Sequence, residues 1–339
     1  MKLWGKEFTK DELLKRVGNI SQIGGIKQYQ LQDGREKGVS AIDFKTGTGF
    51  KFTVLPGRGM DIASCEYKSI PLAWISPTGI VSPYYFEPEG TGFLRSFFGG
   101  LLTTCGLTYI GRPCVDKGKK LGLHGRISNI PAGSVCVDEI WENNDYIMSV
   151  KGKMYEVSNF EENICLERKI QAKMGENRLF IQDKIENLGY QNTEHMILYH
   201  FNFGFPLIDK NVKLILPPGK TKPRNGEAEK ERWNRFSLPI PGYKEKCYYH
   251  NIEPDKNGSV QVFIENKNIG IRFYIKYFKN ELPCLIQWKM MGQGMYVLGI
   301  EPSNCLVEGR AKERKSGRLQ FLKPGESRRY SLEAGIEQI

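Results

Sequence analysis

Apolar and polar residues alternate in short runs along most of the chain, which is the pattern of half-buried β-strands. Phe50, Phe52 and Val54 alternate with polar residues, and Leu179 and Ile181 do so further on. Glycines and prolines lie between the runs and favour turns. Further strands are predicted over residues 134–141, 145–152, 162–171, 178–187, 259–266, 269–277, 283–290 and 295–301. We therefore predict an all-β protein, with antiparallel strands in one large sandwich.

Helical patterns are rare in this sequence. Thr9–Glu12 has the form of a capping box, and an apolar run follows it and stops at Gly18. This predicts a short helix within an N-terminal lead-in over residues 1–20. Residues 71–98 and 217–242 show little periodicity. They predict two long loops, the second of which is a surface loop or flap.

The balance of charge raises the question of an anionic partner. The 49 lysine and arginine residues exceed the 38 acidic residues, giving a net charge of +11. The basic residues are scattered, however, and the densest runs, Lys117–Lys120 and Arg310–Arg318, are interpreted as solvated loops. No basic helix face, zinc finger or helix-turn-helix pattern is present, so we expect no nucleic-acid partner. The charge then serves solubility, or attracts an anionic small molecule.

The cysteines and the hydropathy indicate where the protein resides. None of the eight cysteines forms a CxxC pair, so neither a zinc site nor a thioredoxin-type motif is indicated. The first residues lack an apolar signal core, and no apolar run is long enough to span a bilayer. We expect a cytoplasmic protein with reduced thiols, no metal and no membrane partner.

Two ionisable residues stand in otherwise apolar stretches. His195–Asp209 is mostly apolar and aromatic, with His200 near its middle. An imidazole buried there needs a partner, either as a satisfied core histidine or as an acid–base group. Val297–Val307 similarly carries a single carboxylate, Glu301, just before a proline. A histidine and a glutamate in apolar surroundings are what paired acid–base chemistry needs.

Three motifs, in this order along the chain, resemble one known family. They are Gly122–Gly125 (GLHG), Tyr199–Phe203 (YHFNF) and Leu298–Pro302 (LGIEP). Together they resemble the aldose 1-epimerase, or galactose mutarotase, superfamily, and most closely a divergent branch of poorly defined function. The resemblance covers most of the chain. It implies a single β-supersandwich domain over residues 1–339, with a sugar cleft on one concave sheet.

The resemblance also implies roles for individual residues. His200 falls at the general acid, Glu301 at the general base and His124 at a sugar contact; Asn202 is taken as a further contact. The implied reaction interconverts the anomers of a sugar by opening and closing its ring. A base removes the proton of the anomeric hydroxyl group and an acid protonates the ring oxygen. This isomerase chemistry requires no metal and no organic cofactor.

One part of the sequence departs from the family pattern. Mutarotases carry an Asn-Arg-Ile motif about where Thr103–Leu107 (TTCGL) stands, so the arginine that contacts the sugar is missing here. Arg58 or Arg126 is expected to replace it. Together with the positive net charge, this favours an acidic substrate, such as a uronate or a phosphosugar, over a neutral hexose.

Several other side chains have two interpretations. Arg58 and Asp61 flank a turn and either pair with each other or contact the sugar. Lys289 is costly to bury unpaired and either lies at the cleft, where it binds an anionic group, or has a structural partner. Trp233 and Tyr243 either stack on a sugar or pack within the fold. The following residues are taken as structural or exposed: His195, His250, the buried thiol of Cys105, and a surface ion pair of Glu308 with Arg310.

Two other classes of function stay open beside the enzyme. The first is a carbohydrate-binding or sensor protein that kept the sugar cleft and lost catalysis. The second is a nucleic-acid-binding β protein, which only the charge favours. A large sheet edge would also allow a homodimer.

Overall fold

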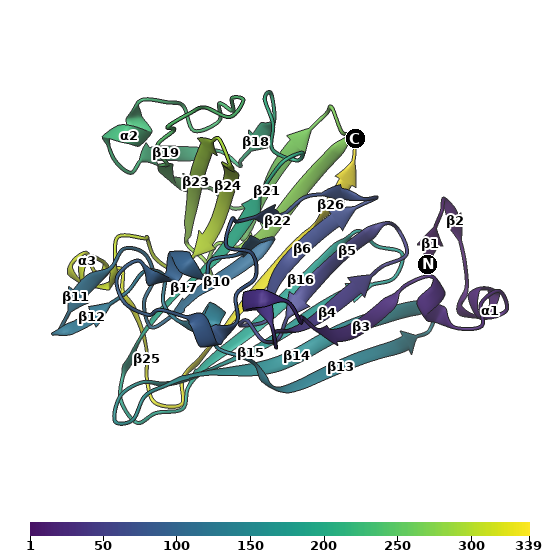
Figure 1. Cartoon of the computed structure of the whole chain (residues 1–339), viewed down its shortest axis with the longest axis horizontal. Coiled ribbons are helices and arrows are strands. Elements are labelled where there is room, and N and C mark those ends of the chain that lie inside the picture. Colours follow the sequence, from purple (N-terminus) through teal and green to yellow (C-terminus); the bar gives the residue numbers. More distant parts are fainter.

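The computed structural model describes residues 1–339 and is built around two large antiparallel sheets (Figure 1). The first sheet has twelve strands, and its main path runs in the order β19-β20-β23-β24-β17-β10-β6-β5-β4-β3. Its members are β3 (Gly25–Gln30), β4 (Ser40–Lys45), β5 (Phe50–Leu55), β6 (Asp61–Tyr67), β7 (Ile70–Pro71), β10 (Leu102–Leu107), β17 (Thr193–Phe203), β19 (Gly219–Pro223), β20 (Lys246–Ile252), β23 (Cys284–Gly292), β24 (Met295–Ser303) and β25 (Gln320–Leu322). The predicted all-β class with antiparallel pairing is confirmed.

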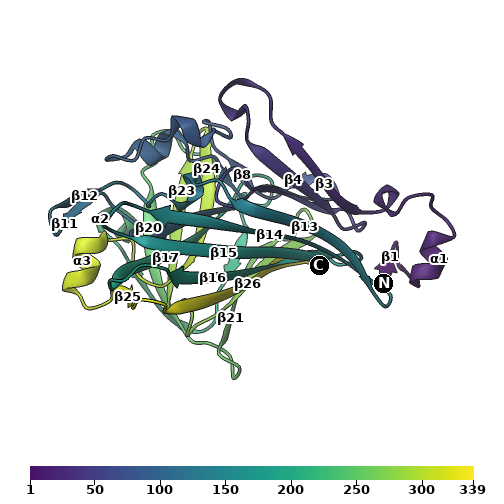
Figure 2. The same ribbon diagram turned by 90° about the horizontal axis from the view of Figure 1, so that it is seen from below.

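The second sheet has eight strands in the order β13-β14-β15-β16-β26-β22-β21-β18. Its long strands lie side by side as one layer in Figure 2. They are β13 (Gly133–Glu142), β14 (Asp145–Val157), β15 (Asn163–Lys173), β16 (Arg178–Asn187), β18 (Lys213–Ile215), β21 (Ser259–Asn266), β22 (Ile271–Phe278) and β26 (Ser327–Gln338). Three small two-stranded sheets complete the strands: β1 (Lys2–Leu3) with β2 (Lys6–Glu7), β8 (Trp74–Ile75) with β9 (Gly99–Gly100), and β11 (Cys114–Asp116) with β12 (Lys119–Leu121).

The core lies between the two large sheets. Alternate residues of β14, namely Tyr146, Met148 and Val150, are buried in it, while Lys151 is exposed on the other face. This is the two-residue period of a strand with one buried face. The largest buried cluster contains 57 residues and takes side chains from both sheets. Burial of this shared apolar surface holds the sheets together.

The helices are short and depend on local or tertiary contacts. In α1 (Lys10–Leu14) the capping box forms as predicted: the Thr9 hydroxyl accepts from the Glu12 backbone N–H at 3.2 Å, and the Glu12 carboxylate accepts from the Thr9 N–H at 2.8 Å. The predicted flap contains β19, which pairs with β20 just beyond it, and α2 (Gly226–Glu229). None of the helices is both long and apolar enough to cross a bilayer.

The run Arg310–Arg318, expected as a loop, instead contains α3 (Arg310–Lys315). Arg310 is buried, and its Nε donates to Asp116 at 2.7 Å. Glu308 pairs with Arg224 rather than with Arg310, so the expected surface pair is wrong. The tertiary partner Asp116 is remote in the sequence, which is why the local pattern of charges did not predict this helix.

Candidate functional site

A cavity of about 550 Å³ lies against the first sheet. Its floor comes from β17, β24 and β23, and its walls come from loops that include the segment predicted as a long loop over residues 71–98. The size is in the range of small-molecule sites. Two groups of lining residues matter for chemistry: the aromatic Trp74, Phe93, Phe97 and Trp288, and the ionisable Arg112, His124, His200, Arg224, Glu245 and Glu301.

Strand alternation places His200 in this cavity. Its neighbours Tyr199 and Phe201 belong to the core between the sheets, so His200 faces the opposite side of β17. In the pairing of β17 with β24, Phe201 lies opposite Ile300. The same register puts His200 opposite Glu301, and directly opposed side chains of neighbouring strands are in contact distance. The two residues predicted to form an acid–base pair are therefore brought together.

The pair lies at the bottom of the cavity. His200 Nε2 and Glu301 Oε1 are 3.2 Å apart, and the two residues are only 5% and 2% exposed. The ring of His124 is next to them, with its centroid 6.0 Å from that of His200. Three buried polar atoms here have no hydrogen-bond partner in the protein: Nδ1 of His124, Nδ1 of His200 and Oε1 of Glu301. Since buried polar groups are normally paired, these atoms indicate a site for a polar ligand.

His124 is held in an unusual backbone conformation. Its φ of 58° lies in the left-handed region, which is uncommon for residues other than glycine. Hydrogen bonds fix the backbone on both sides: His124 N–H donates to the Gly111 carbonyl, and its own carbonyl accepts from Gly106 N–H, both at 3.1 Å. Backbone strain of this kind clusters at functional sites. The imidazole is thereby positioned beside the pair rather than in the core.

Burial sets the protonation states of the three groups. Burial raises the pKa of Glu301 to about 8, although the nearby Arg224 opposes the shift. Burial, followed by the neighbouring His124, holds the pKa of His200 well below its usual value. Burial and Arg224 lower the pKa of His124 to about 4. At neutral pH both imidazoles are therefore neutral and the Glu301 carboxyl group retains its proton.

Aromatic rings surround His200 and Glu301. The centroids of Phe97 and Trp288 lie 5.3 and 5.6 Å from that of His200. Trp74 packs edge-on against Trp288 at 6.1 Å. Trp288 Nε1 donates to the Glu245 carboxylate at 2.8 Å, which fixes the orientation of the indole. Aromatic walls of this kind offer flat apolar surfaces against which a ligand can pack.

Some residues predicted to contact the sugar lie outside the cavity. Arg58 is wholly buried and donates to the carbonyls of Ser128 and Ser96 at 2.8 and 3.0 Å. Asp61 accepts from Arg168 at 3.3 Å and does not pair with Arg58, so the expected ion pair between them is wrong. Buried as they are, Arg58 and Asp61 serve the interior of the fold and do not line the cavity.

Five more candidates also lie outside the cavity lining. Asn202 Nδ2 donates to the carbonyls of Gly99 and His200, at 3.2 and 2.8 Å, which supports the strand that carries His200. Arg126 is exposed elsewhere. Lys289 faces away from its neighbour Trp288 and pairs with Glu231 at 2.6 Å. The remaining aromatic candidates have structural contacts: Trp233 packs on His250 at 5.2 Å, and the Tyr243 hydroxyl donates to Glu231 at 2.7 Å.

Sequence reasoning missed the aromatic wall and two arginines of the cavity. Ile286 lies opposite Glu301, and the two-residue period of a strand puts Trp288 on the same face as Ile286. Lys289, the residue predicted from the sequence, faces the other way. Arg112 and Arg224 come from turns, where no periodicity tells which way a side chain points. No group of three His, Cys, Asp or Glu side chains in the chain is placed to hold a metal ion.

The architecture matches that of several solved structures. A crystal structure from Klebsiella pneumoniae, provisionally named an aldose 1-epimerase, superposes with a TM-score of 0.88 at 24% identity, covering 97% of this chain and 86% of that one. A galactose mutarotase-like protein from Clostridium acetobutylicum superposes with a TM-score of 0.65 at 16% identity, covering 94% of this chain and 100% of that one. A galactose 1-epimerase from Lactobacillus acidophilus superposes with a TM-score of 0.60 at 12% identity, covering 93% of this chain and 99% of that one. The fold is therefore the galactose mutarotase-like fold.

The sequence also assigns the chain to a family. Residues 36–336 match the model described as Domain of unknown function (DUF4432), and the chain belongs to that family. A comparison with curated proteins finds no match. The predicted resemblance to a divergent branch of the mutarotase-like superfamily is confirmed.

Proposed function

We propose that this protein is an aldose-1-epimerase-like isomerase that interconverts the anomers of a sugar, with His200 and Glu301 as its acid–base pair. The observation that carries the proposal is the 3.2 Å separation of His200 Nε2 and Glu301 Oε1 on the floor of an aromatic cavity. The names of the structural neighbours agree with this class of reaction.

The geometry suits a reaction at a single carbon. The anomeric carbon of a pyranose carries both the hydroxyl group and the ring oxygen, so two adjacent side chains can reach both oxygens. The base removes the hydroxyl proton as the acid protonates the ring oxygen, and the bond between the anomeric carbon and the ring oxygen breaks. A carbonyl group forms, the open chain rotates, and the ring closes on the other carbonyl face. Closure returns each proton to the group that held it first.

The resemblance assigns the base to Glu301 and the acid to His200. In the resting pair the mobile proton is on Glu301, because burial raises the pKa of this carboxyl group to about 8. Its transfer to His200 Nε2 produces the carboxylate and the imidazolium that the assignment needs, with no change in the number of protons. The pair is active while it holds this proton, and we expect the rate to fall as the pH rises through about 8.

The test is the exchange between anomers, measured by saturation-transfer NMR over a panel of neutral and acidic sugars. The wild-type protein is expected to accelerate exchange of at least one sugar. Glu301→Gln and His200→Asn are each expected to lower that rate by roughly 10²–10⁴-fold, the usual contribution of one acid–base group. Glu66→Gln, a change in an exposed carboxylate that pairs with Lys51, is the matched control. Failure to accelerate any sugar contradicts the proposal.

A carbohydrate-binding or sensor protein is the second candidate, favoured by the aromatic wall around His200. It predicts that a sugar stabilises the fold thermally while its anomers exchange at the uncatalysed rate. A ligand at 100-fold its Kd stabilises a protein by about 2.7 kcal/mol, so a thermal-shift screen detects binding whether or not turnover occurs.

A further inference from the structure

Two arginines stand together at the wall of the cavity. Arg112 and Arg224 both line it, and both donate to the carbonyl of Val307: Arg112 through its backbone N–H at 3.3 Å and Arg224 through Nη2 at 3.1 Å. Gly111 permits this approach, because it has φ +79° and a Cβ there would lie 2.4 Å from the Val307 carbonyl oxygen. The turn at Gly111 therefore packs directly on Val307, which Arg224 also contacts.

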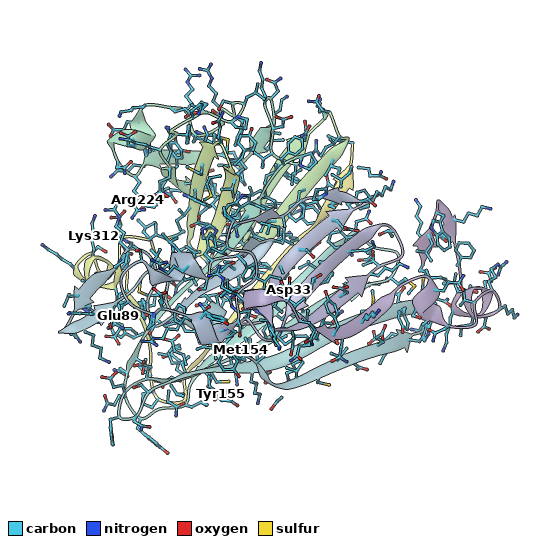
Figure 3. All side chains as sticks on the ribbon, viewed as in Figure 1. Asp33, Glu89, Met154, Tyr155, Arg224 and Lys312 are labelled. Atoms are coloured by element: carbon cyan, nitrogen blue, oxygen red, sulfur yellow. The ribbon has the colours of Figure 1, made fainter.

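The positive charge at this wall is only partly compensated. Arg224 pairs with Glu308 at 2.9 Å, and Lys312 pairs with the same carboxylate at 2.8 Å. Figure 3 shows Arg224 and Lys312 at the same edge of the molecule, near α2 and α3. Arg112 is exposed and forms no ion pair within 4.0 Å. Glu308 thus pairs with two cations, and Arg112 has no carboxylate partner.

The acidic residues of the cavity do not restore the balance. Glu245 adds one carboxylate to the cavity, where it accepts from Trp288 Nε1 at 2.8 Å and forms no ion pair with either arginine. Burial raises the pKa of Glu301 to about 8, so this group carries little charge at neutral pH. The guanidinium group of Arg112 is therefore available to bind an anionic ligand in the cavity.

We propose that Arg112 and Arg224 form an anion subsite of the cavity, and that the substrate is a sugar carrying a carboxylate or phosphate group; this rests on the proposed sugar site. A guanidinium group binds either anion through two parallel N–H···O bonds, which gives both affinity and orientation. The subsite holds the charged substituent at the rim while the reacting carbon faces His200 and Glu301. It takes the place expected for Arg58, Arg126 and Lys289.

Binding, measured apart from turnover, tests this subsite. Glucose, glucuronate and glucose 6-phosphate are titrated calorimetrically into the full-length wild-type protein and Arg112→Ala. At low salt we expect at least one acidic sugar to bind about 10-fold or more tightly than glucose. Arg112→Ala should bind that acidic sugar roughly 10- to 100-fold more weakly, the equivalent of one charge-assisted hydrogen-bonded contact. Its affinity for glucose should not change. The two acidic sugars separate a carboxylate subsite from a phosphate subsite.

Control variants protect the interpretation. Arg329→Ala removes another exposed arginine, on β26, that is outside the cavity lining, and should change no affinity. Arg112→Lys keeps the charge and should retain part of the preference. Equal affinity for all three sugars, no binding of either acidic sugar, or an equal loss for all sugars in Arg112→Ala would overturn the subsite. Binding that depends on Arg112 without anomer exchange would instead uphold the subsite and contradict the proposed isomerase.

Discussion

The two faces of the first sheet bury ionisable groups in opposite ways. On the face toward the second sheet, Arg168 donates to both oxygens of Asp183, at 2.9 and 2.7 Å, and to the Thr104 hydroxyl at 2.9 Å. On the cavity face, Glu301 and His200 touch each other, and Glu301 Oε1 and His200 Nδ1 have no hydrogen-bond partner in the protein. The two clusters lie on opposite sides of β17, since Tyr199 donates to Asp183 at 2.7 Å while His200 faces the cavity.

Burial therefore has two different consequences for an ionisable residue. A buried group whose hydrogen bonds are made by the protein, as those of Asp183 are, is part of the structure, and removing its partner costs stability. A buried group that has an unmade hydrogen bond beside a cavity is free to bind a ligand. Breaking the first cluster should therefore affect folding, and breaking the second should affect chemistry.

Arg168→Met should give the largest loss of stability. It leaves the wholly buried carboxylates of Asp183 and Asp61 without their cation, which costs about 3–5 kcal/mol in comparable buried pairs. The free energy of unfolding in urea measures this. Arg272→Met, which breaks a more exposed pair with Glu265, is the control and should cost about 1 kcal/mol or less. Equal losses in the two variants would contradict the distinction.

Gly299→Ala should disturb the chemistry with much less effect on folding. A Cβ at this position would lie 2.8 Å from Glu301 Oε1 and 3.0 Å from His200 Cε1. Displacing these groups by about 1 Å is enough to slow a reaction roughly 100-fold. Anomer exchange in the variant measures the effect. Gly133→Ala, a strand position where the nearest atom is 4.0 Å away, should leave the rate unchanged, and a normal rate in Gly299→Ala would contradict the placement of the site.

A further expected effect is a difference in stability that depends on pH. The pKa of Glu301 is raised from 4.5 in the unfolded chain to about 8 in the fold, so the folded state holds this proton more tightly. Its contribution is fully present below about pH 4.5 and is lost as the pH rises to about 8, by at most about 1.4 kcal/mol per pH unit. Glu301→Gln lacks this loss. The Tm of the variant minus that of wild type should therefore increase as the pH rises across that range. A difference in Tm that does not change with pH would argue against a buried carboxyl group.

Much of the fold was predictable because strand periodicity is local. The alternating runs predicted over residues 134–187 correspond to β13–β16, and those over residues 259–301 to β21–β24, within a few residues at the ends. His200 and Glu301 were predictable because single ionisable residues stand out in apolar strands. Their contact was not, because it depends on the register of β17 with β24, which the sequence of either strand does not specify.

The residues around the pair were harder to predict for a related reason. Choosing Lys289 over Trp288 required knowing which face of β23 meets the cavity, and neighbouring residues of a strand face opposite ways. Arg112 and Arg224 reach the cavity only because two turns meet at Val307. Arg58 has the residue type that suits a sugar contact, but the turn that carries it is buried among carbonyl groups.

The proposed acid–base pair of His200 and Glu301 is tested most directly by the rate of anomer exchange for the best-bound sugar. The rate is followed from neutral pH to above about pH 8 in wild type and Glu301→Gln. We predict a wild-type rate that is constant near neutral pH and falls above about pH 8, and a variant rate that is roughly 10²–10⁴-fold lower at neutral pH. An unchanged rate in Glu301→Gln, or no acceleration by the wild-type protein, would contradict it.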